Sequence, residues 1–132
     1  MNKPIEARAA LRRGNRSQAF RILRDHMEEL LDIDDMYRAR LACVEFINLM
    51  MEVRRPADAA RMLGNLETAN LRDGSFVRTL IATAATTAIA ADPDPTLDQE
   101  RALGRDLDDR QALLAMRNVL DRLLAEGQLV TA

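Results

Sequence analysis

Few residues of this chain have the chemistry that catalysis or metal binding requires. The sequence contains one histidine, His26, and one cysteine, Cys43. A single histidine cannot build a histidine-based metal cluster within one chain. His26 could pair with Asp25 or Glu29, but a histidine inside a predicted helix is more often a core or boundary residue. Cys43 lies in an apolar helical stretch with no histidine nearby in the sequence to lower its pKa. We therefore expect a small buried hydrophobic side chain there rather than a nucleophile.

Two acidic runs resemble metal-binding loops only superficially. The run "DIDDMY" (32–37) lacks the glycine and the distant glutamate that an EF-hand requires. The run "DPDPTLDQE" (92–100) has the residues of a turn followed by helix caps. The sequence thus predicts no catalytic residue, no cofactor and no metal ion, and we do not expect an enzyme.

The composition predicts a single all-α domain spanning residues 1–132. Aromatic residues make up only 3% of the chain, so its core must consist of Ala, Leu, Ile and Met, which with Arg and Glu favour helices. The longest uncharged run, 79–91, is too short and too weakly apolar to cross a bilayer. No apolar segment follows the N-terminal arginines as a signal peptide would require, and the lone cysteine excludes an intramolecular disulfide. We expect a cytoplasmic protein with no membrane contact. The predominance of arginine over lysine indicates a GC-rich, bacterial genome.

Helix caps and breakers divide the chain into seven predicted helices with short connections. Their expected spans are about residues 4–13, 15–31, 35–53, 56–70, 75–91, 96–107 and 109–126. Capping boxes are expected at Asn15 with Gln18, Thr96 with Gln99, and Asp108 with Gln111. The acidic run at 32–35 ends the second helix and caps the third, and Gly127 stands where a left-handed C-terminal cap would follow the last helix.

Apolar stripes predict which helix faces are buried. The second helix should bury Ala19, Leu23, Met27 and Leu30. The third should bury a stripe of Leu41, Val44, Ile47 and Met51, with Phe46, Met50 and Val53 on its flank. The last helix carries large apolar residues on one face, which we expect to cover the end of the fifth and sixth helices.

The predicted helices also form antiparallel pairs that repeat along the chain. The segment "QAFRIL" (18–23) aligns with "DAARML" (58–63), and each begins the second helix of a pair. The segments 76–92 and 96–107 repeat this layout with a slightly larger offset. A period of this length built from two helices is typical of a helical solenoid.

The segment "GNRSQA" (14–19) resembles the turn of tetratricopeptide repeats, in which a glycine ends the first helix and a small residue, here Ala19, packs against it. Ala7 and Leu23 also match that family's small and large positions. The resemblance implies a right-handed array of helix pairs, and a compact helical bundle is the alternative architecture. We predict a non-catalytic protein–protein interaction module: a small scaffold, adaptor or regulatory subunit that binds another protein or a peptide. In such arrays the first helices line the concave, peptide-binding face. This implies that the contact residues are Arg38, Asn48, Arg78 and Thr79.

The opening residues also support an alternative, a DNA-binding transcriptional regulator with an N-terminal helix-turn-helix at about residues 5–25. The small, glycine and apolar positions of that motif would be Ala10, Gly14, Phe20 and Leu23. Its recognition helix would carry three basic side chains able to neutralise phosphates, namely Arg16, Arg21 and Arg24. Polar residues flank the turn glycine, however, and the net charge is −2, so we do not expect nucleic acid as the partner.

Finally, the first helix is short and covers little of the second. We therefore expect Phe20 and Met27 to lie on an exposed flank where a second copy docks, giving a homodimer at micromolar concentration.

Overall fold

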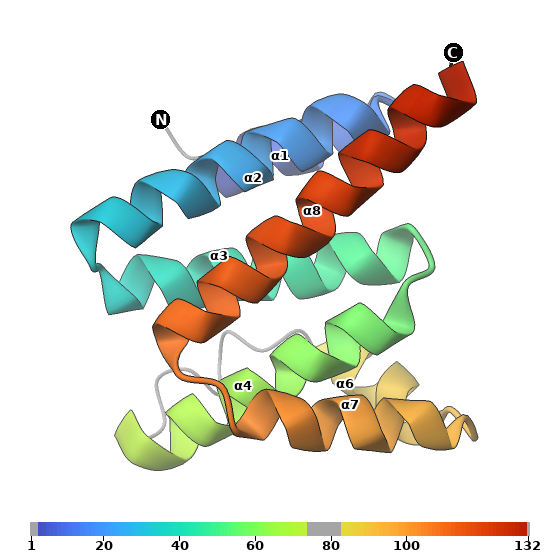
Figure 1. The fold of residues 1–132 in the computed structure, drawn as a ribbon. Coiled ribbons are helices and arrows are strands. Elements are labelled where there is room, and N and C mark those ends of the chain that lie inside the picture. The colour runs from blue at the N-terminus through green and yellow to red at the C-terminus, as the bar shows by residue number, and fades with distance from the viewer. Residues whose placement is uncertain (1–2, 74–82, 132) are drawn as a thin grey trace.

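The computed structural model describes residues 3–73 and 83–131, and these fold into seven α-helices and no strand (Figure 1). The helices are α1 (Lys3–Arg12), α2 (Arg16–Ile33), α3 (Met36–Glu52), α4 (Pro56–Asp73), α6 (Thr83–Ala91), α7 (Pro95–Arg105) and α8 (Asp109–Thr131). The prediction of an all-α chain is confirmed. The first part of the predicted fifth helix lies outside the described residues.

Several helices begin where the capping residues predict. The backbone N–H of Gln18 donates to Asn15 Oδ1 at 3.1 Å. In a full capping box the Gln18 side chain would accept from the Asn15 backbone N–H. Here Gln18 Oε1 accepts from the Asn15 side-chain amide instead, and the Asn15 backbone N–H donates to Ala10 O. Asp108 and Gln111 form a complete capping box at the start of α8, with bonds of 2.7 and 2.9 Å. Asp35 caps α3.

Two predicted helix caps are wrong, one at the start of α7 and one at the end of α8. Thr96 does not cap α7, because the helix begins one residue earlier at Pro95 and Asp94 Oδ1 accepts the Thr96 N–H at 2.9 Å. Proline suits the first helical position, since it has no N–H to satisfy there. Gly127 does not end α8, which continues to Thr131. The helix continues through Gly127 despite the low helix propensity of glycine.

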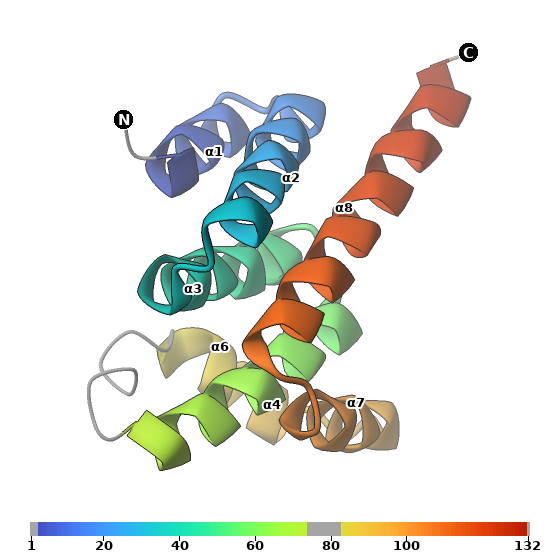
Figure 2. The ribbon, with the colours of Figure 1, turned by 60° about the vertical axis from the view of Figure 1, so that its left-hand side comes forward.

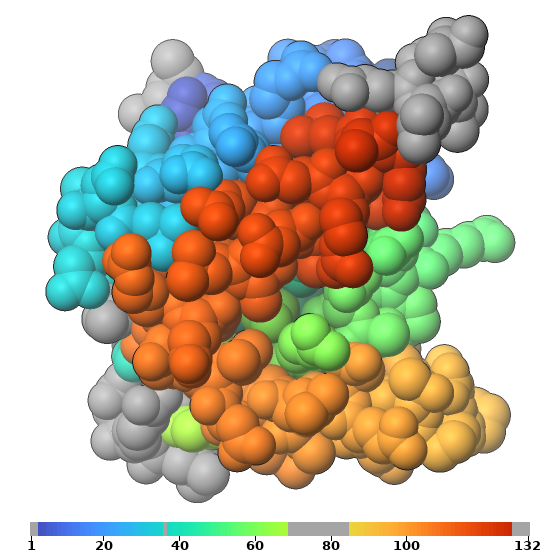
Figure 3. All heavy atoms as spheres, viewed as in Figure 1, coloured from blue at the N-terminus to red at the C-terminus, as the bar shows by residue number. Residues whose placement is uncertain are grey.

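The helices pack against one another in pairs (Figures 1 and 2). α1 packs on α2, α3 packs on α4, and α7 packs on α4 in the most extensive helix–helix contact among the described residues. The last helix then turns back: α8 packs chiefly on α2 and more lightly on α3 and α4. Figure 3 shows α8 covering the middle of this face. The prediction that the last helix covers the fifth and sixth is therefore wrong, because the apolar face of α8 is matched by that of α2.

The core confirms two of the expected stripes and shifts a third. In α2, Ala19, Leu23, Met27 and Leu30 are all at most 1% exposed. In α8 the buried face includes Leu113, Met116, Leu120 and Leu123. In α3 the fully buried large side chains are Phe46, Ile47 and Met50, whereas Leu41, Val44 and Met51 are only partly buried. The face of α3 is thus rotated from the predicted one.

Candidate functional site

An open groove of about 700 Å³ lies between α1, α3 and α6. It lies on the first helices of the two N-terminal pairs. The residues that line it are Pro4, Ala7, Arg8, Leu11 and Arg12 of α1, Leu23 of α2, Glu45, Asn48, Leu49, Met51 and Glu52 of α3, Arg54, and Ala85 and Ala88 of α6. Its size falls within the range of pockets that hold a ligand.

The two long walls of the groove carry opposite charges. Arg8 and Arg12 lie one turn apart on α1, while Glu45 and Glu52 lie two turns apart on α3. Arg8 forms an ion pair with Glu45 and so ties α1 to α3. Neither Arg12 nor Glu52 forms an ion pair with another described residue, and both are exposed. The groove can therefore offer a donor on one side and an acceptor on the other.

Between these charges the lining is apolar and small. Leu11 and Leu49 supply bulk, whereas Ala7, Ala85 and Ala88 supply little. Small side chains on facing helices leave room for side chains of a partner. Ala88 is exposed at the groove, so the α6 wall is accessible.

The residue that closes the α3 end of the groove has an unusual backbone. Arg54 has a φ of 62°, in the left-handed region that glycine favours. The turn brings the Arg55 N–H to Met50 O at 2.7 Å and completes the cap of α3. An arginine pays a conformational cost at this position that glycine would not.

Of the four predicted partner-binding residues, the structure places one in the groove. Asn48 lines it. Arg38 is exposed at the opposite end of α3, where it pairs with Asp35 at 3.4 Å, and it does not line the groove. Arg78 and Thr79 lie outside the described residues. The charged residues of the walls were not predicted, although their helical spacing on α1 and α3 was available as a signal.

The expected dimer face is wrong. Phe20 is 7% exposed and Met27 is fully buried. Both lie in the core of the single chain because α8 packs on α2. They are not available to a second copy.

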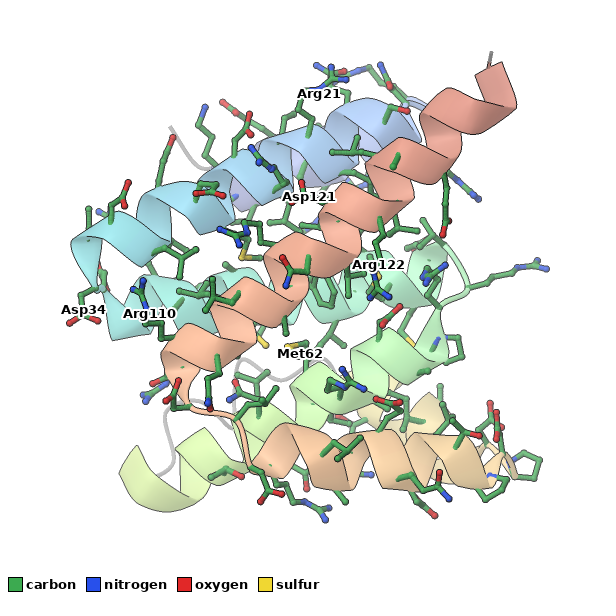
Figure 4. All side chains as sticks on the ribbon, viewed as in Figure 1. Arg21, Asp34, Met62, Arg110, Asp121 and Arg122 are labelled. Carbon is green, nitrogen blue, oxygen red and sulfur yellow. The ribbon has the colours of Figure 1, made fainter. Side chains whose placement is uncertain are left out.

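The arginines of the alternative recognition helix differ in their surroundings. Arg16 and Arg21 are exposed, and Figure 4 shows Arg21 pointing away from the molecule. Arg24 instead donates to Asp121 of α8 at 2.8 Å, and this hydrogen bond raises the pKa of Arg24. Asp121 lies where α8 crosses α2 (Figure 4). Because α8 covers this side of α2, Arg24 is engaged within the chain.

Cys43 and His26, the two side chains with catalytic potential, are both affected by burial. Burial raises the pKa of the Cys43 thiol far above its ordinary value. Burial also lowers the pKa of His26, whose Nδ1 is buried without a hydrogen-bond partner. Within residues 3–73 and 83–131, no three His, Cys, Asp or Glu side chains gather as metal ligands. None of the described helices is both long and apolar enough to span a membrane.

No protein-family model, curated protein or solved structure matches the chain.

Proposed function

We propose that this chain is a non-catalytic protein-interaction module, a small scaffold, adaptor or regulatory subunit, and that it binds a peptide segment of its partner in the groove between α1, α3 and α6. The observation that carries the proposal is the groove itself, about 700 Å³ in volume and lined by three helices. The expectation from tetratricopeptide-like repeats, that the first helices present the binding face, supports the same location.

The lining suits a polypeptide. Apolar side chains such as Leu11 and Leu49 can bury the anchor side chains of a peptide, which supply most of the binding energy of such contacts. Asn48 presents both a donor and an acceptor to a peptide backbone. Arg12 and Glu52, at opposite walls, can each pair with a charged group of the partner.

A selection from random peptides displayed on phage tests this proposal. Ala88→Trp should fill the groove with an indole while leaving the fold intact, because Ala88 is exposed. Ala102→Trp makes the same change at an exposed alanine of α7 that does not line the groove. We expect selected peptides to bind the wild type and Ala102→Trp, and to lose binding to Ala88→Trp. Failure to select any peptide, or equal binding to Ala88→Trp, would contradict the proposal.

A further inference from the structure

Five exposed arginines stand at one end of the molecule without an ion pair to any described residue. They form what we call the basic corner: Arg12, Arg13, Arg16, Arg21 and Arg54. Several other arginines of the described chain pair with acids of other helices. Arg61 reaches Glu100 at 2.6 Å, and Arg117 reaches Glu28 at 2.9 Å. Charges of the basic corner are therefore available to a partner.

The topology places the basic corner at one mouth of the groove. Because α2 returns between them, α1 and α3 run toward the same end, and the α1–α2 and α3–α4 turns lie together there (Figure 1). The Arg8–Glu45 ion pair holds these two helices in register. Arg12 and Arg54 both line the groove and belong to the corner. A segment leaving the groove at this end passes Arg12 and Arg54, next to the turn that carries Arg13 and Arg16.

The backbone at Arg54, where the chain completes the cap of α3, is also unusual for an arginine. The left-handed conformation at φ 62° favours glycine, and a long cationic side chain stands there nonetheless. Residues kept in such conformations concentrate at functional sites. Asp34, the other described non-glycine residue with positive φ, is of a type that tolerates this region.

We propose that the segment bound in the groove continues into acidic residues, and that the basic corner recognises their carboxylates. This inference rests on the proposed function. The partner is thus a polypeptide with apolar anchors followed by Asp or Glu. The apolar part is held between α1, α3 and α6, and the acidic part lies over the α1–α2 turn.

The dimensions of the corner favour carboxylates of a peptide over a nucleic acid. Duplex DNA carries a charge about every 1.7 Å along its axis and binds long basic tracts. On α2 the unpaired arginines extend only from Arg16 to Arg21, about 7.5 Å along a helix. Asp25 follows on the same helix, and Glu52 adjoins on α3. These acids would repel a continuing phosphate backbone, whereas a few carboxylates fit.

Peptides selected on the wild type supply the probe for the test. In the tightest of them, each Asp and Glu is replaced by Asn or Gln, which keeps the shape and removes the charge. We expect the amide version to bind at least about tenfold more weakly, and its affinity to depend less on salt.

Variants of the corner provide the complementary measurement. Arg12→Gln, Arg16→Gln and Arg21→Gln should each weaken the acidic peptide about two- to fivefold, as expected for exposed charge pairs, and should leave the amide peptide unchanged. Arg110→Gln, at the opposite end of the molecule (Figure 4), is the matched control and should change neither. Arg54→Gly should weaken the acidic peptide while its melting temperature stays equal or rises, so that loss of binding cannot be loss of fold.

The outcomes separate the two proposals. Peptides that depend on the groove but show no enrichment in Asp or Glu, with corner variants binding as the wild type does, would overturn the acidic partner and leave the groove standing. Binding retained by Ala88→Trp would overturn the groove itself. Retention of duplex DNA at physiological salt, lost in the corner variants, would overturn the peptide partner in favour of a nucleic acid.

Discussion

Gly64 of α4 and Gly104 of α7 each lie against the backbone of the opposite helix where these two helices cross. A Cβ atom added to Gly64 would overlap the carbonyl oxygen of Arg101, and one added to Gly104 would overlap the carbonyl oxygen of Arg61. The backbones thus touch at two reciprocal points. Around them, Glu67 of α4 pairs with both Arg101 and Arg105 of α7. This crossing fixes α7 on α4 and, through the short connection that follows, directs α8 back toward α2.

Gly64→Ala and Gly104→Ala should each destabilise the fold. Every obstacle to the new methyl group is backbone of the opposite helix, so the helices must move apart. We expect a loss of about 1–3 kcal/mol in the free energy of unfolding, or more, measured by urea denaturation. Gly127→Ala is the control: its Cβ would meet only Ser17 Oγ at 3.8 Å. Because Gly127 lies inside α8, the alanine should stabilise by up to about 1 kcal/mol.

Ala19→Leu and Ala59→Leu test the aligned positions of the two N-terminal helix pairs. Both alanines are fully buried, so the additional atoms have no free space and each change should cost about 1–3 kcal/mol. Ala102→Leu, at an exposed position of α7, should leave the melting temperature nearly unchanged. An unchanged melting temperature in both buried variants would remove the physical basis of the alignment.

Features with a local cause could be predicted from the sequence. Asn15 and Asp108 cap helices because a side-chain oxygen reaches an N–H three residues ahead, which needs no tertiary structure. The stripe of α2 has a clear period because polar residues fill its other face. In α3, apolar residues surround most of the helix, so the period leaves the rotation undetermined. Met50, which was expected only on the flank, is accordingly fully buried, whereas Met51, which was expected in the stripe, is partly buried.

Features that depend on distant segments could not be predicted. The crossing of α4 and α7 requires Gly64 and Gly104, which are unremarkable glycines until the helices meet. The burial of Phe20 depends on α8, far along the chain. Asn48 lines the groove, whereas Arg38 lies at the opposite end of α3, because the groove reaches only the C-terminal half of that helix.

Cys43 should be unreactive in the folded protein. Its side chain is 2% exposed, and burial raises the thiol pKa, so little thiolate is present and a reagent cannot reach it. Labelling with a thiol-specific chromogenic disulfide should be slow in buffer and fast in denaturant. Fast labelling without denaturant, at the rate of a free thiol, would contradict the packing of α3 against α4.

His26 should make the stability of the fold depend on pH. Burial, the largest cause, lowers its pKa below the ordinary value of 6.5; Arg38 and Lys3 lower it further, and Glu29 acts in the opposite direction. The unfolded chain therefore takes up a proton at a higher pH than the folded chain does. The contribution of neutral His26 to the free energy of unfolding is fully present above the unfolded-state pKa, and it is lost as the pH falls through the lower pKa of the folded state. The melting temperature of the wild type should decrease from about pH 7.5 to about pH 5.5. His26→Gln should remove that part of the decrease while leaving the acid-induced loss at lower pH, which carboxylates cause. If the melting temperatures of the two proteins depend on pH in the same way across this interval, burial of His26 does not contribute to the pH dependence.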